Sequence, residues 1–321
     1  MNKNPFSFYD FLGYLFPGLV AMMLLTYCVY LGTSAPIEKY FSITTFTNMF
    51  SEILNMKWWE STVVIIVLAY ISGHVIAYLS STSVEFFANR VFGYPSYYLL
   101  HPEEDKRILF SKYFMYENKI NYSHLNIFMR LIHTIFNRLK MFVDGKFIWR
   151  LFVSFMLFPI SVIFLPLNKK ISIVKFVTRP LDRYVRNSIF TKITALSEKL
   201  NISRPDVNSR ADYHRIIMHY VYLNIPQCQR KTDNYIAIYG FLRAITLITC
   251  LFFDYLFVIQ LLTIYEYWAT DISYGCFNWK VLWILMGMLA FCNVLFMGFI
   301  KFYRRFTLEN YMSLLAGSTN Q

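Results

Sequence analysis

The chain has 321 residues, of which 56% are hydrophobic and only 16% are charged, and its net charge is +12. An average soluble domain has about 45 to 50% apolar and about 25% charged residues, so this composition excludes an ordinary soluble protein. Its five cysteines lack any Cys-x-x-Cys spacing, which argues against a zinc site or a disulfide framework. We therefore expect an all-α membrane protein without a metal or a cofactor.

Two apolar runs near the N-terminus, 11–31 and 62–80, are long enough to cross a bilayer, which takes about 20 residues. The first lacks a small-residue cleavage site, so we interpret it as a retained span rather than a signal peptide. The second contains His74 as its only ionisable residue. We expect both runs to be transmembrane helices.

A basic portion follows the second run. Its pattern predicts a helix over 83–91 that ends at Gly93, then a turn-rich stretch over 94–105 and an amphipathic helix over 123–139. Residues 151–167 are uncharged but short for a span and contain Pro159 and Pro166. For these residues we expect a re-entrant, interfacial or buried helix.

The remaining elements are again helical. We expect helices over 183–200 and 209–223, and then a long helix that begins at Pro226 and enters a third span, 244–265. The fourth span is 281–300. No alternating strand pattern is present, which gives an all-α fold with four spans.

Orientation follows from the distribution of lysine and arginine, which accumulate on the cytoplasmic side of a membrane. Residues 82–233 hold 23 Lys and Arg against 11 Asp and Glu, whereas 32–61 hold two Lys against three Glu. We therefore expect both termini on the cytoplasmic side. The predicted division is a helix pair over 1–81, a basic cytoplasmic portion over 82–233, a second helix pair over 234–305 and a cytoplasmic tail over 306–321.

Three polar residues lie within the spans: Asp254 near the middle of the third, His74 in the second and Asn293 in the fourth. An ionised carboxylate at the membrane centre costs at least about 2.5 kcal/mol, so it needs a partner or a role. The three side chains are predicted to form one polar cluster. It would serve either a proton or ion path or hydrogen bonding between helices.

Basic residues near the predicted membrane surface are candidates for contact with anionic lipid headgroups. They are Arg130, Arg138, Lys140, Arg243, Arg304 and Arg305. Nucleic acid is a weaker candidate partner because no recognised nucleic-acid motif accompanies these charges. A cytoplasmic partner protein or a homo-oligomer is also compatible with the sequence.

Signatures of common enzymes are missing from the sequence, including the Walker loop, the G-x-S-x-G elbow and H-E-x-x-H. His101 with the acids that follow it is more typical of a solvated turn than of a metal site. Arg210 and His214 depart from an R-x4-H spacing. We therefore assign no catalytic residue.

Four stretches resemble those of uncharacterised prokaryotic multi-pass membrane proteins: FLGYLFPG (11–18), SGHVIAYLSS (72–81), GYPS (93–96) and YGFLR (239–243). Proteins of this kind recur in bacterial phage-defence neighbourhoods. The resemblance implies a non-enzymatic protein of the bacterial inner membrane, either a membrane-perturbing effector or another defence component. An ion channel or transporter that uses Asp254 and His74 is the alternative, and a lipid-modifying enzyme is a second one.

Overall fold

The computed structural model describes residues 10–33, 58–100, 145–167, 179–200, 213–270 and 279–317, and every element within these ranges is a helix. The predicted all-α class is confirmed for this part of the chain. In chain order the elements are η1 (Phe11–Leu15), α2 (Phe16–Thr33), α4 (Trp58–Ser80), η3 (Ser81–Glu85), α5 (Phe86–Val91), α6 (Pro95–Leu100), α9 (Gly145–Met156), α10 (Phe158–Leu167), α12 (Arg183–Lys199), α13 (Tyr213–Asn224), α14 (Pro226–Thr270) and α15 (Trp279–Gly317).

Four helical stretches are long and apolar enough to cross a membrane: 11–28, 62–100, 226–262 and 282–317. The apolar window of the second is only 11% buried inside the protein. Val67, Ile71 and Val75 on this helix are each at least half exposed. A helix that is hydrophobic on all sides and yet exposed requires an apolar surrounding, which lipid provides.

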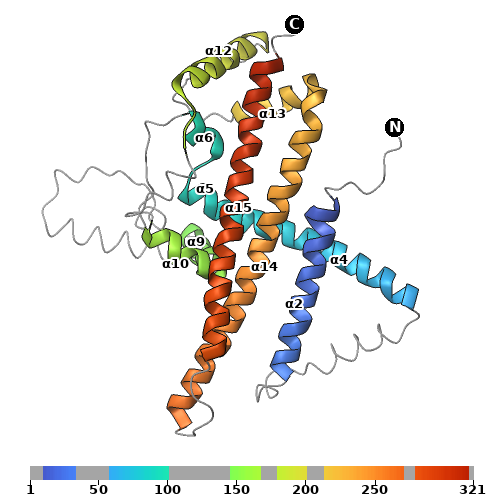
Figure 1. Ribbon diagram of the computed structural model, residues 1–321, viewed down its shortest axis with the longest axis vertical. Coiled ribbons are helices and arrows are strands. Elements are labelled where there is room, and N and C mark those ends of the chain that lie inside the picture. Colours follow the sequence, from blue (N-terminus) through green and yellow to red (C-terminus); the bar gives the residue numbers. More distant parts are fainter. Residues whose placement is uncertain are drawn as a thin grey trace, which may run out of the picture.

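The lower part of the molecule, as drawn in Figure 1, is a bundle that we call the stem. Here α14 and α15 pack against each other along their length, α2 packs beside α14, and α4 runs across them (Figure 1). The stem core joins α5, α9, α10, α14 and α15 through buried residues such as Phe87, Leu157, Leu247 and Phe296.

A second core lies at the other end of α14 and α15, in a part that we call the head. Here α6, α12 and α13 pack against the final turns of α15 around buried Leu99, Ile189, Ile217 and Tyr311. With 45 and 39 residues, α14 and α15 are about 67 and 58 Å long at 1.5 Å per residue. The hydrocarbon core of a bilayer is only about 30 Å thick, so both helices extend well beyond it.

Residues 151–167 do not form one straight helix, because α9 and α10 meet at Leu157 with a bend of 108°. Their lengths of 12 and 10 residues give about 18 and 15 Å, each about half the thickness of a bilayer. Trp149 and Phe155 of α9 are exposed, whereas Arg150 is buried. The number of candidate spans is therefore four, or up to five if this bent pair crosses as one.

Several helices predicted from the sequence occur in the structure with similar bounds. Helices occur at Arg183–Lys199 and Tyr213–Asn224, and a long helix does begin at Pro226. The prediction of a turn-rich stretch over 94–105 is wrong for Pro95–Leu100, which forms α6. Proline favours the first turn of a helix, where its missing N–H is not needed, so Pro95 starts this helix. The predicted helix over 123–139 lies outside the described residues.

The predicted divisions of the chain fall inside continuous helices. The boundary at residue 81 lies where α4 continues through η3 into α5, the one at 233 lies within α14, and the one at 305 lies within α15. Unbroken helical backbone therefore runs through each of these three boundaries.

Candidate functional site

Three of the four stretches that carry the family resemblance meet at one place in the stem. Residues 11–18 cross residues 69–73 of α4 so closely that a Cβ added to Gly18 would lie 1.8 Å from the Ala69 carbonyl oxygen. Likewise, a Cβ added to Gly73 would lie 2.0 Å from the Tyr14 carbonyl oxygen. Glycine is therefore required on both sides of this crossing.

An aromatic cluster flanks the glycine crossing. The ring of Tyr14 stacks on that of His74 with centroids 3.9 Å apart, and Tyr70 contacts the same imidazole edge-on at 4.6 Å. On the side of α14, Phe16 meets Phe241 at 5.7 Å. These contacts join the first, second and fourth resemblance stretches through side chains as well as through backbone.

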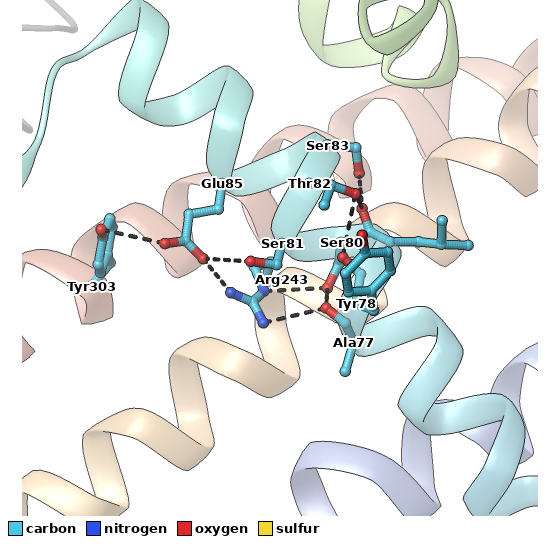
Figure 2. Close-up of polar contacts among 10 residues, drawn as sticks. Ala77, Tyr78, Ser80, Ser81, Thr82, Ser83, Glu85, Arg243 and Tyr303 are labelled. Carbon is cyan, nitrogen blue, oxygen red and sulfur yellow. Dashed lines mark hydrogen bonds and ion pairs between the residues drawn. The ribbon is translucent and has the colours of Figure 1, made fainter. Parts of the chain in front are cut away.

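The strongest polar interaction at this place connects α14 with the end of α4. Figure 2 shows the guanidinium of Arg243 between Glu85 on one side and Ser80 and Ala77 on the other. Its Nη1 forms an ion pair with Glu85 Oε2, its Nε donates to Ser80 Oγ at 3.2 Å, and its Nη2 donates to the Ala77 carbonyl at 3.4 Å. The hydroxyl of Tyr303 on α15 donates to Glu85 Oε1 at 3.5 Å. Three helices thus share one charged network.

The local sequence explains why α4 can change its course at this point. Residues 80–83 are Ser-Ser-Thr-Ser. The hydroxyls of Ser80, Thr82 and Ser83 donate back to carbonyls of the preceding turn, for example Ser83 to Leu79 at 2.6 Å, whereas Ser81 donates to Glu85 Oε2 at 3.5 Å. Such bonds stabilise carbonyls that a regular α-helix would otherwise satisfy. Most of these residues belong to the wider π-helical turn η3, which begins at Ser81 and ends at Glu85. Turns of this kind inside helices are frequent at functional sites.

The electrostatic setting makes this ion pair more than a surface contact. The side chains of Arg243 and Glu85 are only 15% and 24% exposed, so solvent screens them incompletely. Removing one partner of such a pair leaves the other charge poorly solvated. The network therefore ties α4, α14 and α15 together and penalises their separation.

The structure places the predicted intramembrane residues at different points. His74 lies in the aromatic cluster, and Asn293 donates to the carbonyls of Pro159 at 3.2 Å and Leu289 at 2.6 Å. Both carboxylate oxygens of Asp254 are buried without a hydrogen-bond partner among the described residues. Asp254 is eleven residues from Arg243 along α14, or about 16 Å. No hydrogen bond joins any two of these three predicted site residues.

The residues predicted at lipid headgroups have several environments. Arg243 has protein partners in the network described above. Arg304 donates to the Arg179 carbonyl at 2.6 Å, and Arg305 lies over the ring of Phe302 at 5.9 Å. The other three predicted residues, Arg130, Arg138 and Lys140, lie outside the described residues.

Sequence reasoning overlooked Glu85, the partner of Arg243. Its signal was present, since Glu85 is the only acid between residues 61 and 100 and follows the second apolar run by five positions. Arg243 stands directly before the third apolar run. An isolated acid and an isolated base at the ends of two spans therefore indicated a pair.

Comparison with protein-family models, with curated proteins and with solved structures finds no match to this chain. The function must therefore be inferred from the arrangement of its own residues.

Proposed function

We propose that this chain is a non-enzymatic, multi-pass protein of the bacterial inner membrane in which the state of a cytoplasmic head is transmitted to the membrane-embedded stem. Its biological role would be that of a membrane-perturbing effector or another component of anti-phage defence. The observation that carries the proposal is the continuity of two long helices: α15 contributes buried residues to both cores without a break, and α14 runs from beside α13 of the head into the stem core.

The physical argument rests on the stiffness of these helices. A change in packing around Tyr311 or Leu314 in the head acts on the same helix that carries Phe296 and Phe299 in the stem. Packed cores and helix interfaces switch between discrete arrangements rather than deforming continuously. The network of Arg243, Glu85 and Tyr303 lies beside the stem core, where it resists sliding of α14 relative to α4.

The assignment of the head to the cytoplasm rests on the positive-inside bias of residues 82–233. The assignment to bacteria and to phage defence rests on the resemblance of four short stretches alone. Reporter fusions at Ser209 and at Gly317 should both give a cytoplasmic signal. An external signal at either position would contradict the proposed orientation.

The decisive experiment interrupts α15 between the two cores. Lys301 is exposed, so Lys301→Ala should leave both cores intact, whereas Lys301→Pro removes a helix hydrogen bond and kinks the helix. Both variants would be expressed inducibly in bacteria, with membrane potential and growth as readouts. We expect depolarisation by the wild type and Lys301→Ala but not by Lys301→Pro at equal membrane levels. Depolarisation by all three would contradict transmission through α15, and depolarisation by none would contradict the effector role.

One observation favours the ion channel or transporter as a second candidate. Asp254 lies within the most apolar part of α14, and neither of its oxygens has a hydrogen-bond partner in the described part of the chain. Reconstitution in liposomes tests this candidate, because a channel should conduct ions and Asp254→Asn should reduce the conductance. The lipid-modifying enzyme stays a prediction to which no residue is assigned.

A further inference from the structure

The end of α6 is the place where three separate parts of the head come together. The Leu99 carbonyl accepts a hydrogen bond from the backbone N–H of Leu181 at 3.1 Å. The neighbouring Leu100 carbonyl accepts from Arg186 Nη1 on α12 at 3.5 Å. The segment that leads into α12 is therefore docked against α6.

The third part is α15. Its Arg304 donates from Nη2 to the Arg179 carbonyl at 2.6 Å, and Arg304 also lies within electrostatic range of the Tyr98 hydroxyl. Tyr98 of α6 and Arg304 of α15 are thus neighbours, and Arg186 of α12 binds the end of the same helix α6.

Each of these three side chains carries a buried donor that is unsatisfied. Tyr98 Oη, Arg186 Nε and Arg304 Nε have no hydrogen-bond partner among the residues that the structure describes. Tyr98 as a whole is only 9% exposed. Buried donors are nearly always paired, because water can no longer satisfy them. Three such donors on elements that meet at the end of α6 indicate an acceptor outside the described part of the chain.

The charge at this point specifies the kind of acceptor. The segment that leads into α12 carries Arg179, Arg183 and Arg186 against one acid, Asp182, and α15 adds Arg304. The excess of positive charge favours an anion. Guanidinium groups match the oxygens of phosphate in geometry and form charge-assisted hydrogen bonds with them.

We propose that Tyr98, Arg186 and Arg304 form a binding site for a phosphate group. Arg304 follows the predicted apolar run of α15 by four residues, or about 6 Å, which places it at the depth of lipid headgroups. The phosphate of an anionic lipid and that of a soluble ligand share the required chemistry. The site is independent of the transmission along α15 proposed above.

The test uses the full chain, purified in detergent and stripped of lipid. Its melting temperature would be measured with sodium phosphate against sodium chloride at equal ionic strength, and with phosphatidylglycerol against a glycolipid that lacks phosphate. Stabilisation by phosphate alone supports a soluble ligand, stabilisation by phosphatidylglycerol alone supports a lipid, and stabilisation by both supports either source. No stabilisation by either probe would overturn the proposal.

Variants establish whether the three donors are responsible. Losing one charge-assisted bond should weaken binding about tenfold or more, so we expect this loss for Arg304→Gln. The matched control is Arg305→Gln, because Arg305 has the same charge at nearly the same depth but lies over Phe302. Tyr98→Phe removes only a hydroxyl that has no hydrogen-bond partner in the described ranges, so it should fold normally and bind severalfold more weakly even if Arg304→Gln does not fold. Equal loss in Arg304→Gln and Arg305→Gln, with normal binding by Tyr98→Phe, would show diffuse surface charge instead of a site.

Discussion

Substituting Gly73 by alanine should separate the first two helices of the stem. A Cβ at this position would lie 2.0 Å from the Tyr14 carbonyl oxygen, whereas ordinary van der Waals contact begins near 3.4 Å. The obstructing atom belongs to the backbone, so no side-chain rotation can relieve the clash, and α4 must move away from η1 by the difference. Forced overpacking of this kind costs about 1 to 3 kcal/mol. We expect Gly73→Ala to lower the free energy of unfolding by about 2 kcal/mol, and Gly18→Ala to act in the same direction.

Reversible unfolding in mixed micelles, followed by circular dichroism, would measure these changes. Gly287→Ala is the matched control, because Gly287 lies in apolar α15 with nothing within 4 Å of an added Cβ. Since alanine is favoured over glycine within a helix by about 1 kcal/mol, this variant should be as stable as the wild type or more stable. The Gly18→Ala, Gly73→Ala double variant should lose less than the sum of the single losses, because one displacement relieves both clashes. If Gly73→Ala unfolds like Gly287→Ala, the close crossing of η1 and α4 is wrong.

Three further predictions concern the ion pair, Asp254 and Gly93. Arg243→Gln and Glu85→Gln should each lower the free energy of unfolding, and a double-mutant cycle should give a coupling of about 1 to 3 kcal/mol; a coupling near zero would contradict the network in Figure 2. If Asp254 is structural, Asp254→Asn should insert and unfold like the wild type, since polar pairs within membranes average only about 0.6 kcal/mol. A well-folded Asp254→Asn variant that has lost its effect on membrane potential would instead assign Asp254 a functional role. Gly93→Ala should lower the free energy of unfolding by about 1 kcal/mol. The cause would be backbone strain alone, because Gly93 has a φ of 84° and an added Cβ would meet nothing within 4 Å. Thermal unfolding that matches the wild type would contradict this backbone conformation.

The helices could be predicted from the sequence, whereas the contacts between them could not. Apolar runs located the four long helices, and Pro226 marked the start of α14, because span length and helix termini are local properties. The bend at Leu157 also had a local signal in Pro159, which cannot donate to the preceding turn.

Contacts between distant segments lack such a signal. The glycines at 18 and 73 lie in two separate predicted spans, and only the folded chain brings them together. Arg243 was predicted to face lipid headgroups because its partner Glu85 was overlooked, although both charges are isolated at the ends of apolar runs. The predicted grouping of Asp254 with His74 assumed that residues at comparable positions in their spans meet, but α4 crosses the bundle and brings His74 to η1 instead.

The ion pair of Glu85 and Arg243 joins residues 158 positions apart, which has a consequence for biosynthesis. A ribosome adds about 5 to 20 residues per second, so about 8 to 30 s pass between the synthesis of the two partners. During this interval Glu85, at the end of η3, lacks its counter-ion, and hydration is its available stabilisation. The final position of α4 can therefore be set only when α14 arrives. Until then the nascent N-terminal half depends on the glycine crossing to hold its two helices together.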